Sequence, residues 1–145
     1  MDIAALITWV ITALGGFYML GTWLSRGGAK AGNSRLPVPV LFGHFALAAV
    51  GLVVWISYVI TDKDVLAWTA FGLLVPVALL GFTMLARWIP VHRARSAAAA
   101  AAAAAGQQSE PAEGYFPVPV VVGHGLFAVV TVVLVLLTAL GIGGS

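Results

Sequence analysis

The sequence contains no cysteine and few charged residues. Only 8% of its 145 residues are Asp, Glu, Lys or Arg, and 61% are hydrophobic, whereas roughly 25% of an ordinary soluble domain is charged. The missing cysteines exclude disulfides, thiolate zinc sites, iron–sulfur clusters and the covalent attachment of c-type haem. The low charge excludes a soluble globular domain, and a net charge of +2 is too small to indicate nucleic-acid binding.

Charge is absent from four stretches that are each long enough to cross a bilayer. A hydrocarbon core of about 30 Å needs about 20 apolar residues in a helix. The stretches without Asp, Glu, Lys or Arg cover residues 3–24, 36–61, 65–86 and 115–145. We therefore predict an all-α membrane protein in which residues 1–145 form a single domain of four transmembrane helices.

The cations are concentrated in two of the connecting segments. Six of the seven Lys and Arg residues follow the first span or end the third: Arg26, Lys30, Arg35, Arg87, Arg93 and Arg95. Lys and Arg in short loops tend to stay in the cytoplasm. We therefore expect a multi-pass protein of the plasma (inner) membrane, with the loops 25–35 and 87–115 cytoplasmic and both termini outside.

The segment 90–114 has a composition of its own. It contains nine successive alanines at 97–105, and a stretch of Gly, Gln, Ser, Glu and Pro follows them. Alanine favours the helical conformation, so this run is compatible with a third span that continues as a helix into the cytoplasm. The low complexity nevertheless favours an Ala-rich cytoplasmic linker that carries no chemistry.

The two halves of the chain resemble each other. Residues 36–44 (LPVPVLFGH) align with residues 116–124 (FPVPVVVGH) at an offset of 80, and residues 16–23 align with residues 81–88 at an offset of 65. The simplest explanation is a tandem duplication of a two-helix hairpin, with one repeat at 1–61 and the other at 65–145. Because a hairpin returns the chain to its starting side, we predict a pseudo-two-fold axis along the membrane normal.

This alignment places two histidines, His44 and His124, at equal depth on parallel helices. Each follows a glycine, Gly43 or Gly123, which we expect to let a neighbouring helix or a flat cofactor approach the backbone. No carboxylate, Lys or Arg lies inside the four spans. The two histidines are therefore the interior groups that titrate near neutrality, and such groups in a membrane indicate a functional site by default.

Two imidazoles on opposite faces of one porphyrin can ligate a b-type haem iron. Cations would have to receive its propionates, and we expect Arg35, Arg87, His92 and Arg93 on the same side of the membrane. The arrangement resembles, in architecture, the four-helix membrane-embedded b-type cytochromes, whose transmembrane histidines hold haem. The resemblance implies a haem b cofactor and single-electron transfer together with a partner redox protein or a quinone. A second histidine pair is missing, which leaves room for one haem.

Two further functions stay open. If each histidine only bonds to a carbonyl or hydroxyl on a neighbouring helix, the chain is a cofactor-free accessory subunit that packs against a partner complex or a second copy. A small transporter or sensor is the third candidate, although an Asp or Glu at the midplane is missing. No nucleophile–base pair, phosphate loop or catalytic carboxylate pair is present. We therefore expect an electron carrier or accessory subunit rather than an enzyme.

Overall fold

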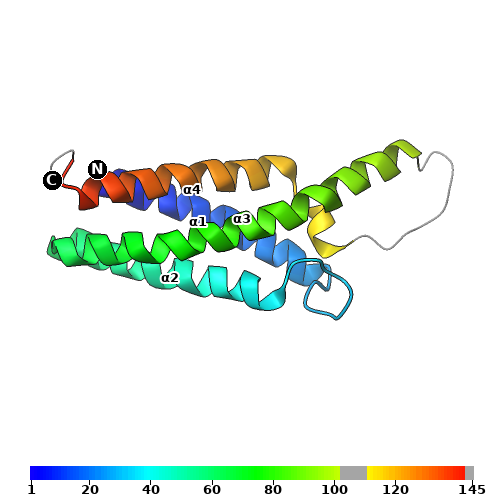
Figure 1. The fold of residues 1–145 in the computed structure, drawn as a ribbon, viewed down its shortest axis with the longest axis horizontal. Helices are drawn as coiled ribbons and strands as arrows, with labels where there is room; N and C mark the ends of the chain where they lie inside the picture. The colour runs from blue at the N-terminus through cyan, green and yellow to red at the C-terminus, as the bar shows by residue number, and fades with distance from the viewer. Residues whose placement is uncertain (102–110, 143–145) are drawn as a thin grey trace.

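The computed structural model describes residues 1–101 and 111–142, and within these residues it is all-helical. Its four long helices are α1 (Asp2–Ser25), α2 (Val38–Thr61), α3 (Asp64–Ala101) and α4 (Val118–Ala139), and a short 3-10 helix, η1 (Ala112–Tyr115), precedes α4 (Figure 1). Each of the four is long and apolar enough to cross a membrane. The predicted all-α membrane fold is confirmed, and the chain is a multi-pass membrane protein.

Proline and glycine set several of the helix ends. Pro37 and Pro117 are extended and directly precede α2 and α4, and each helix has a further proline in its first turn, where the missing N–H costs no hydrogen bond. At the other end of α4, Gly141 adopts a φ of +72° and the Ile142 N–H bonds to the Leu137 carbonyl. This arrangement is a Schellman cap, and it ends the helix before the charge-free stretch 115–145 is complete.

Helix α3 is longer than the third predicted span. It has 38 residues and continues to Ala101, with Pro76 and Pro90 inside it. The helix extends this far because the alanine run has the highest intrinsic helix propensity. The linker predicted at 90–114 therefore begins within α3 and ends within η1, while its residues 102–110 lie outside the described part of the chain.

The helices form two layers. Helix α1 packs mainly against α4, and α2 packs mainly against α3, whereas the contacts of α1 with α2 and of α3 with α4 are less extensive. Figure 1 shows these two pairs lying alongside each other. The first helix of each half thus packs on the second helix of the other half, a pattern that a duplicated hairpin would produce. The duplication and its pseudo-two-fold axis stay predictions.

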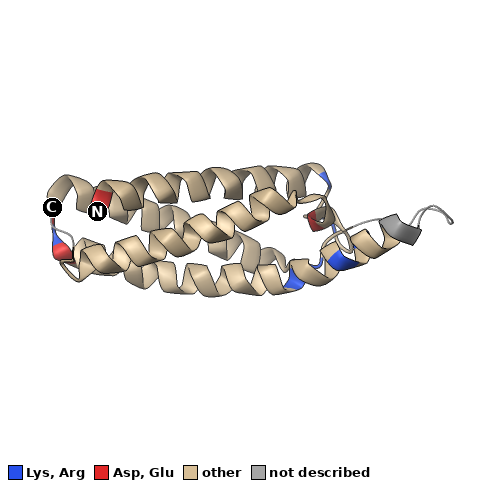
Figure 2. Ribbon diagram, turned by 90° about the horizontal axis from the view of Figure 1, so that it is seen from above, with Lys and Arg blue, Asp and Glu red and all other residues tan. Residues whose placement is uncertain are grey.

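The two ends of the bundle carry different charges. Both termini and the turn at 61–64 lie at one end, here called the terminal end, and the loop 26–37 and η1 lie at the other, here called the loop end (Figure 1). The cations of the segments 26–35 and 87–95 gather at the loop end, and Asp2, Asp62, Lys63 and Asp64 lie at the terminal end (Figure 2). The membrane-facing lengths between them are free of charge.

Large apolar side chains cover the outside of the bundle. The exposed fraction of the residue is 64% for Leu14, 64% for Val53 and 76% for Ile60. An exposed apolar surface of this extent is unfavourable in water but suits the hydrocarbon of a lipid bilayer.

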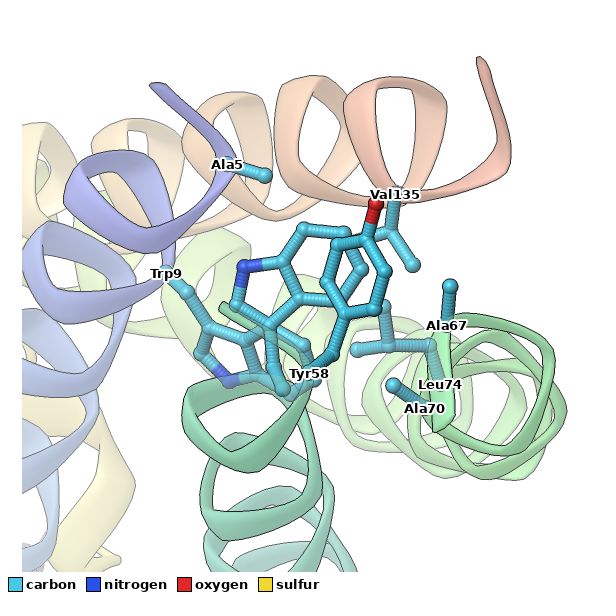
Figure 3. Packing of buried hydrophobic residues seen from close by; sticks show 8 residues of the cluster. Ala5, Trp9, Tyr58, Ala67, Ala70, Leu74 and Val135 are labelled. Atoms are coloured by element: carbon cyan, nitrogen blue, oxygen red, sulfur yellow. The ribbon is translucent and has the colours of Figure 1, made fainter. Parts of the chain in front are cut away.

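The buried core is divided into two clusters. The terminal cluster joins all four helices near the terminal end (Figure 3) and consists of Ala5, Trp9, Trp55, Tyr58, Ala67, Ala70, Leu74 and Val135. The loop cluster lies near the loop end and consists of Trp23, Leu36, Leu41, Trp88, Ala112 and Phe116. Between them, no residue is buried in the segments 10–22, 42–50, 78–87 and 118–130. Side chains therefore fill both ends of the bundle more completely than this middle section, which is at least about 13 Å long.

A buried carboxylate holds the loop end together. Glu113 in η1 is fully buried, and its carboxylate accepts hydrogen bonds from the Ser34 hydroxyl and the Arg35 N–H, both at 2.7 Å. The Trp88 indole N–H donates to the Glu113 carbonyl at 3.1 Å. The segment that leads into α4 is thereby anchored to the loop between α1 and α2 and to α3.

Candidate functional site

His44 on α2 and His124 on α4 face each other between the two layers. Their ring centroids are 6.3 Å apart, and their planes are tilted by 53°. Both lie in the middle section, in helix segments where every residue is at least partly exposed. The structure therefore brings together the two histidines that the sequence singles out, and their role as metal ligands stays a prediction.

Each imidazole is oriented by a backbone carbonyl of its layer partner. His44 Nδ1 lies 2.9 Å from the Val77 carbonyl oxygen of α3, and His124 Nδ1 lies 2.9 Å from the Thr12 carbonyl oxygen of α1. A carbonyl only accepts, so each Nδ1 carries the hydrogen. In the neutral ring the lone pair then resides on Nε2, the nitrogen that remains free to bind a metal.

The two Nε2 atoms adjoin space that protein atoms do not fill. Neither has a hydrogen-bond partner among the described residues. Every fully buried side-chain nitrogen or oxygen in the same part of the chain does have a partner. Consistent with this, both imidazoles are only partly buried although they face each other inside the bundle. The site thus consists of two unpaired imidazole nitrogens beside an open space.

Three glycines contact the histidines, and of these Gly16 and Gly81 come closer to an imidazole than Gly15, which lies beside His124. A Cβ atom built on Gly16 would lie 3.2 Å from His124 Cε1, and one built on Gly81 would lie 3.3 Å from His44 Cε1. Gly16 and Gly81 each stand four residues after the carbonyl that accepts from the ring. A helical side chain leans back over the preceding turn, so a glycine at this position leaves the carbonyl accessible to a ring on the neighbouring helix.

Gly43 and Gly123 have different surroundings from those expected. A Cβ atom on Gly43 would meet only Leu80 Cδ1 at 3.9 Å, and one on Gly123 would meet nothing within 4 Å. Helix α3 therefore reaches the Cβ position of Gly43 only with the end of the Leu80 side chain, and no described atom reaches that of Gly123. A residue next to His44 or His124 in the sequence lies about 100° further around its helix. Their contact with a cofactor stays a prediction.

The repeat alignment also relates the glycines and carbonyls that contact the two histidines, although sequence analysis did not predict a role for them. Gly16 and Gly81 occupy the first position of the stretch that aligns at an offset of 65, and Thr12 and Val77 stand at the same offset. The repeat alignment therefore contains both carbonyl and both glycine positions. Their contact with the histidines depends on which helices pair, and the alignment does not specify this pairing.

The four residues predicted to receive propionates lie at or near the loop end. Arg87 and Arg35 are brought together, since the Arg87 guanidinium donates to the Arg35 carbonyl at 3.3 Å. His92 stacks on the Trp88 ring at 4.9 Å between ring centroids, and Arg93 is exposed on α3. Arg87 is thus joined to the backbone of Arg35, and His92 takes part in an aromatic stack. The contact of these residues with propionates stays a prediction.

Comparison with known proteins adds no family to this picture. No family model matches the chain, and neither the curated proteins nor the solved structures yield a match. The function must therefore be argued from the chemistry of the side chains.

Two imidazoles by themselves do not complete a metal site. No group of three or more His, Cys, Asp or Glu side chains that could hold a metal ion occurs within residues 1–101 and 111–142. A metal between His44 and His124 would therefore need its remaining ligands from a cofactor. A porphyrin supplies four nitrogens in a plane and leaves one axial position on each face, which is the combination that two opposed imidazoles can complete.

Proposed function

We propose that this chain is a membrane-embedded b-type haem protein that passes single electrons, alone or as a subunit of a larger respiratory assembly. His44 Nε2 and His124 Nε2 are the proposed axial ligands, one from each layer of the bundle. A haem bound here would supply a one-electron iron couple in an apolar environment. The role of the chain is to hold the two ligands, exclude water and neutralise the propionates.

The spacing of the two imidazoles carries this proposal. Metal–imidazole bonds of about 2.0 Å on both faces of one iron place the two ring centroids about 6 Å apart. The observed separation is 6.3 Å. Neither Nε2 atom has a hydrogen-bond partner among the described residues, so both are available as ligands at this separation of the rings.

The open middle section supports the same function. A flat apolar macrocycle needs a gap between the layers, and the segments that carry the histidines contain no buried residue over this length. The buried clusters lie toward the two ends of the bundle. Neither cluster contains His44 or His124.

The carbonyl bonds would prepare the histidines as ligands. An Nδ1–H bond to a carbonyl fixes the tautomer and the orientation of the ring. The bonds to Val77 and Thr12 do this for His44 and His124 in the same way. Arg35, Arg87 and Arg93, which lie at or near the loop end, would neutralise the propionates.

The charge distribution supports an orientation in the plasma membrane. The cations gather at the loop end, and Lys and Arg in short loops stay cytoplasmic. We propose that the loop end faces the cytoplasm and that both termini face outward. The histidine pair then lies toward the cytoplasmic side of the bilayer, and a partner redox protein or a quinone would exchange electrons with it.

An absorption spectrum tests the haem proposal. Purified in detergent after expression with added haem, the protein should show a Soret band that shifts on dithionite reduction, together with resolved α and β bands. His44→Ala and His124→Ala should each lose this low-spin spectrum. His92→Ala is the matched control and should retain it, because His92 stacks on Trp88 instead of facing the pair. An unchanged spectrum in both His44→Ala and His124→Ala would refute the ligand assignment.

A cofactor-free accessory subunit is the second candidate. The observation that favours it is the hydrogen bond from each histidine to a carbonyl of the neighbouring helix, because such bonds hold membrane helices together without any ligand. A wild-type protein without a visible spectrum, combined with reduced helix packing in His44→Ala and His124→Ala, would favour this function over haem binding.

A further inference from the structure

Two arginines at the loop end converge on one aromatic ring. The guanidinium carbon Cζ of Arg26 lies 3.9 Å from the centre of the Tyr115 ring, and that of Arg95 lies 5.1 Å from the same centre. The two guanidinium carbons are therefore at most 9.0 Å apart, the sum of these distances. Arg26 directly follows α1, Tyr115 ends η1 and Arg95 belongs to α3. We call this group, which joins three elements, the arginine–tyrosine cluster.

The charge of Arg26 is not neutralised by the described residues around it. Its guanidinium forms no hydrogen bond or salt bridge within residues 1–101 and 111–142. Glu113, the carboxylate of η1, is fully buried and accepts from the Ser34 hydroxyl and the Arg35 N–H instead. Arg26 itself is exposed. An exposed guanidinium is thus stacked on a ring, and the described part of the chain supplies no anion for it.

The arginine–tyrosine cluster should lie at the depth of the lipid phosphates. Helix α1 has 24 residues and is about 36 Å long at about 1.5 Å per residue, whereas the hydrocarbon core of a bilayer measures about 30 Å. A helix that spans the core therefore extends into the headgroup region, and Arg26 is the first residue after α1. Tyr115 stands three residues before the start of α4, and tyrosine is enriched at this interface.

We infer that the arginine–tyrosine cluster binds the phosphate of an anionic phospholipid in the leaflet at the loop end. A guanidinium that stacks on an aromatic face keeps its planar N–H edge available, and two parallel N–H groups match the oxygens of a phosphate. Arg26 is the proposed phosphate ligand, Tyr115 orients its guanidinium, and Arg95 adds positive charge beside the same ring. An anionic headgroup is favoured over a zwitterionic one because basic groups at this depth attract net negative charge.

The cluster is a particular site within the general positive charge of the loop end (Figure 2). The repeat alignment does not produce it twice: Tyr115 corresponds to Arg35 at an offset of 80, and Arg26 corresponds to the buried Val91 at an offset of 65. Lys30 is an exposed cation of the same loop as Arg26, and it contacts no aromatic ring among the described residues. Lys30 therefore offers a matched control with the same charge but without the ring.

Lipid titration of the full chain tests this inference. The protein, delipidated in a neutral detergent, is titrated with phosphatidylglycerol or with phosphatidylcholine of the same acyl chains, and bound lipid is counted by native mass spectrometry. We expect the wild type to bind phosphatidylglycerol at least about tenfold more tightly than phosphatidylcholine. Arg26→Gln should lose most of this preference, Tyr115→Leu should weaken it, and Lys30→Gln should bind like the wild type. Arg26→Lys keeps the charge but not the planar fork, so its preference should be intermediate.

The outcomes separate a specific lipid site from its alternatives. Equal losses in Arg26→Gln and Lys30→Gln would overturn the inference in favour of a diffuse attraction to anionic surfaces. Wild-type preference in Arg26→Gln or in Tyr115→Leu would also overturn it. Displacement of phosphatidylglycerol by an equal concentration of inorganic phosphate would overturn it in favour of a free phosphate. Circular dichroism checks that each variant is helical, and Arg26→Lys replaces Arg26→Gln if the latter does not fold; wild-type preference in Arg26→Lys would then overturn the role of the guanidinium.

Discussion

Alanine at Gly81 and alanine at Gly123 should have opposite effects on stability. Both glycines are helical and lie at the level of the histidines, one in α3 and one in α4. A Cβ atom on Gly81 would lie 3.3 Å from His44 Cε1, while one on Gly123 would meet nothing within 4 Å. The same chemical change therefore meets a fixed imidazole at Gly81 and open space at Gly123.

The size of the difference follows from two terms. Replacing a helix-interior glycine by alanine stabilises the helix by about 0.5–1 kcal/mol in both variants. In Gly81→Ala this gain is opposed by overpacking, which destabilises the protein by about 1–3 kcal/mol. The ring cannot readily move away, because the hydrogen bond from His44 Nδ1 to the Val77 carbonyl restrains it. Gly123→Ala should therefore be more stable than the wild type, and the free energies of unfolding of the two variants should differ by about 1–3 kcal/mol.

Titration with SDS from mild detergent micelles, followed by circular dichroism at the helical bands, measures this difference. The reasoning would be refuted if Gly81→Ala were as stable as Gly123→Ala, or if Gly123→Ala were the less stable of the two. Gly16→Ala provides an internal repeat of the experiment, because its Cβ atom would lie 3.2 Å from His124 Cε1. It should behave like Gly81→Ala.

Three further outcomes are expected. Glu113→Ala should lower the free energy of unfolding by about 2–3 kcal/mol in the same SDS titration, because the hydroxyl and the amide that donate to its buried carboxylate lose their acceptor; a wild-type value would show that the anchor does not stabilise the bundle. Thr131→Val removes the hydroxyl that lies 3.0 Å from the Thr8 hydroxyl of α1. It should lower the free energy of unfolding by about 0.6 kcal/mol, and a decrease several times larger would contradict a simple interhelical hydrogen bond. Since the chain has no cysteine, Lys63→Cys on intact cells should react with a membrane-impermeant maleimide and Lys30→Cys should not; the reverse labelling would invert the proposed orientation.

The positions of the helices could be predicted from charge alone, but their ends could not. Charge-free runs mark where a chain can cross lipid, whereas a helix ends where its backbone hydrogen bonds end. Arg87 ends the third run but does not interrupt α3, which continues to Ala101. Conversely, the fourth run continues to Ser145, while α4 ends at Ala139 because Gly141 adopts a left-handed conformation.

The candidate site could be predicted in part. The repeat alignment indicates that His44 and His124 lie at equal depth, and the structure places them face to face. The glycines next to them in the sequence are not the glycines next to them in space, because contacts across helices depend on which helices pair. The burial of Glu113 could not be predicted for a similar reason: the residue belongs to a low-complexity segment, and only its bonds to the loop between α1 and α2 give it a structural role.

The pairing of α1 with α4 determines when the site can exist during synthesis. Helices α2 and α3 are neighbours in the chain and can associate as soon as both have left the ribosome, but α1 must wait for its main partner. At about 5–20 residues per second, that wait lasts roughly ten seconds. His124 cannot reach the Thr12 carbonyl before α4 is inserted. The nascent chain therefore presents only one imidazole of the pair for most of its synthesis. Assembly of the complete pair, and any loading of a cofactor into it, follows translation of the last helix.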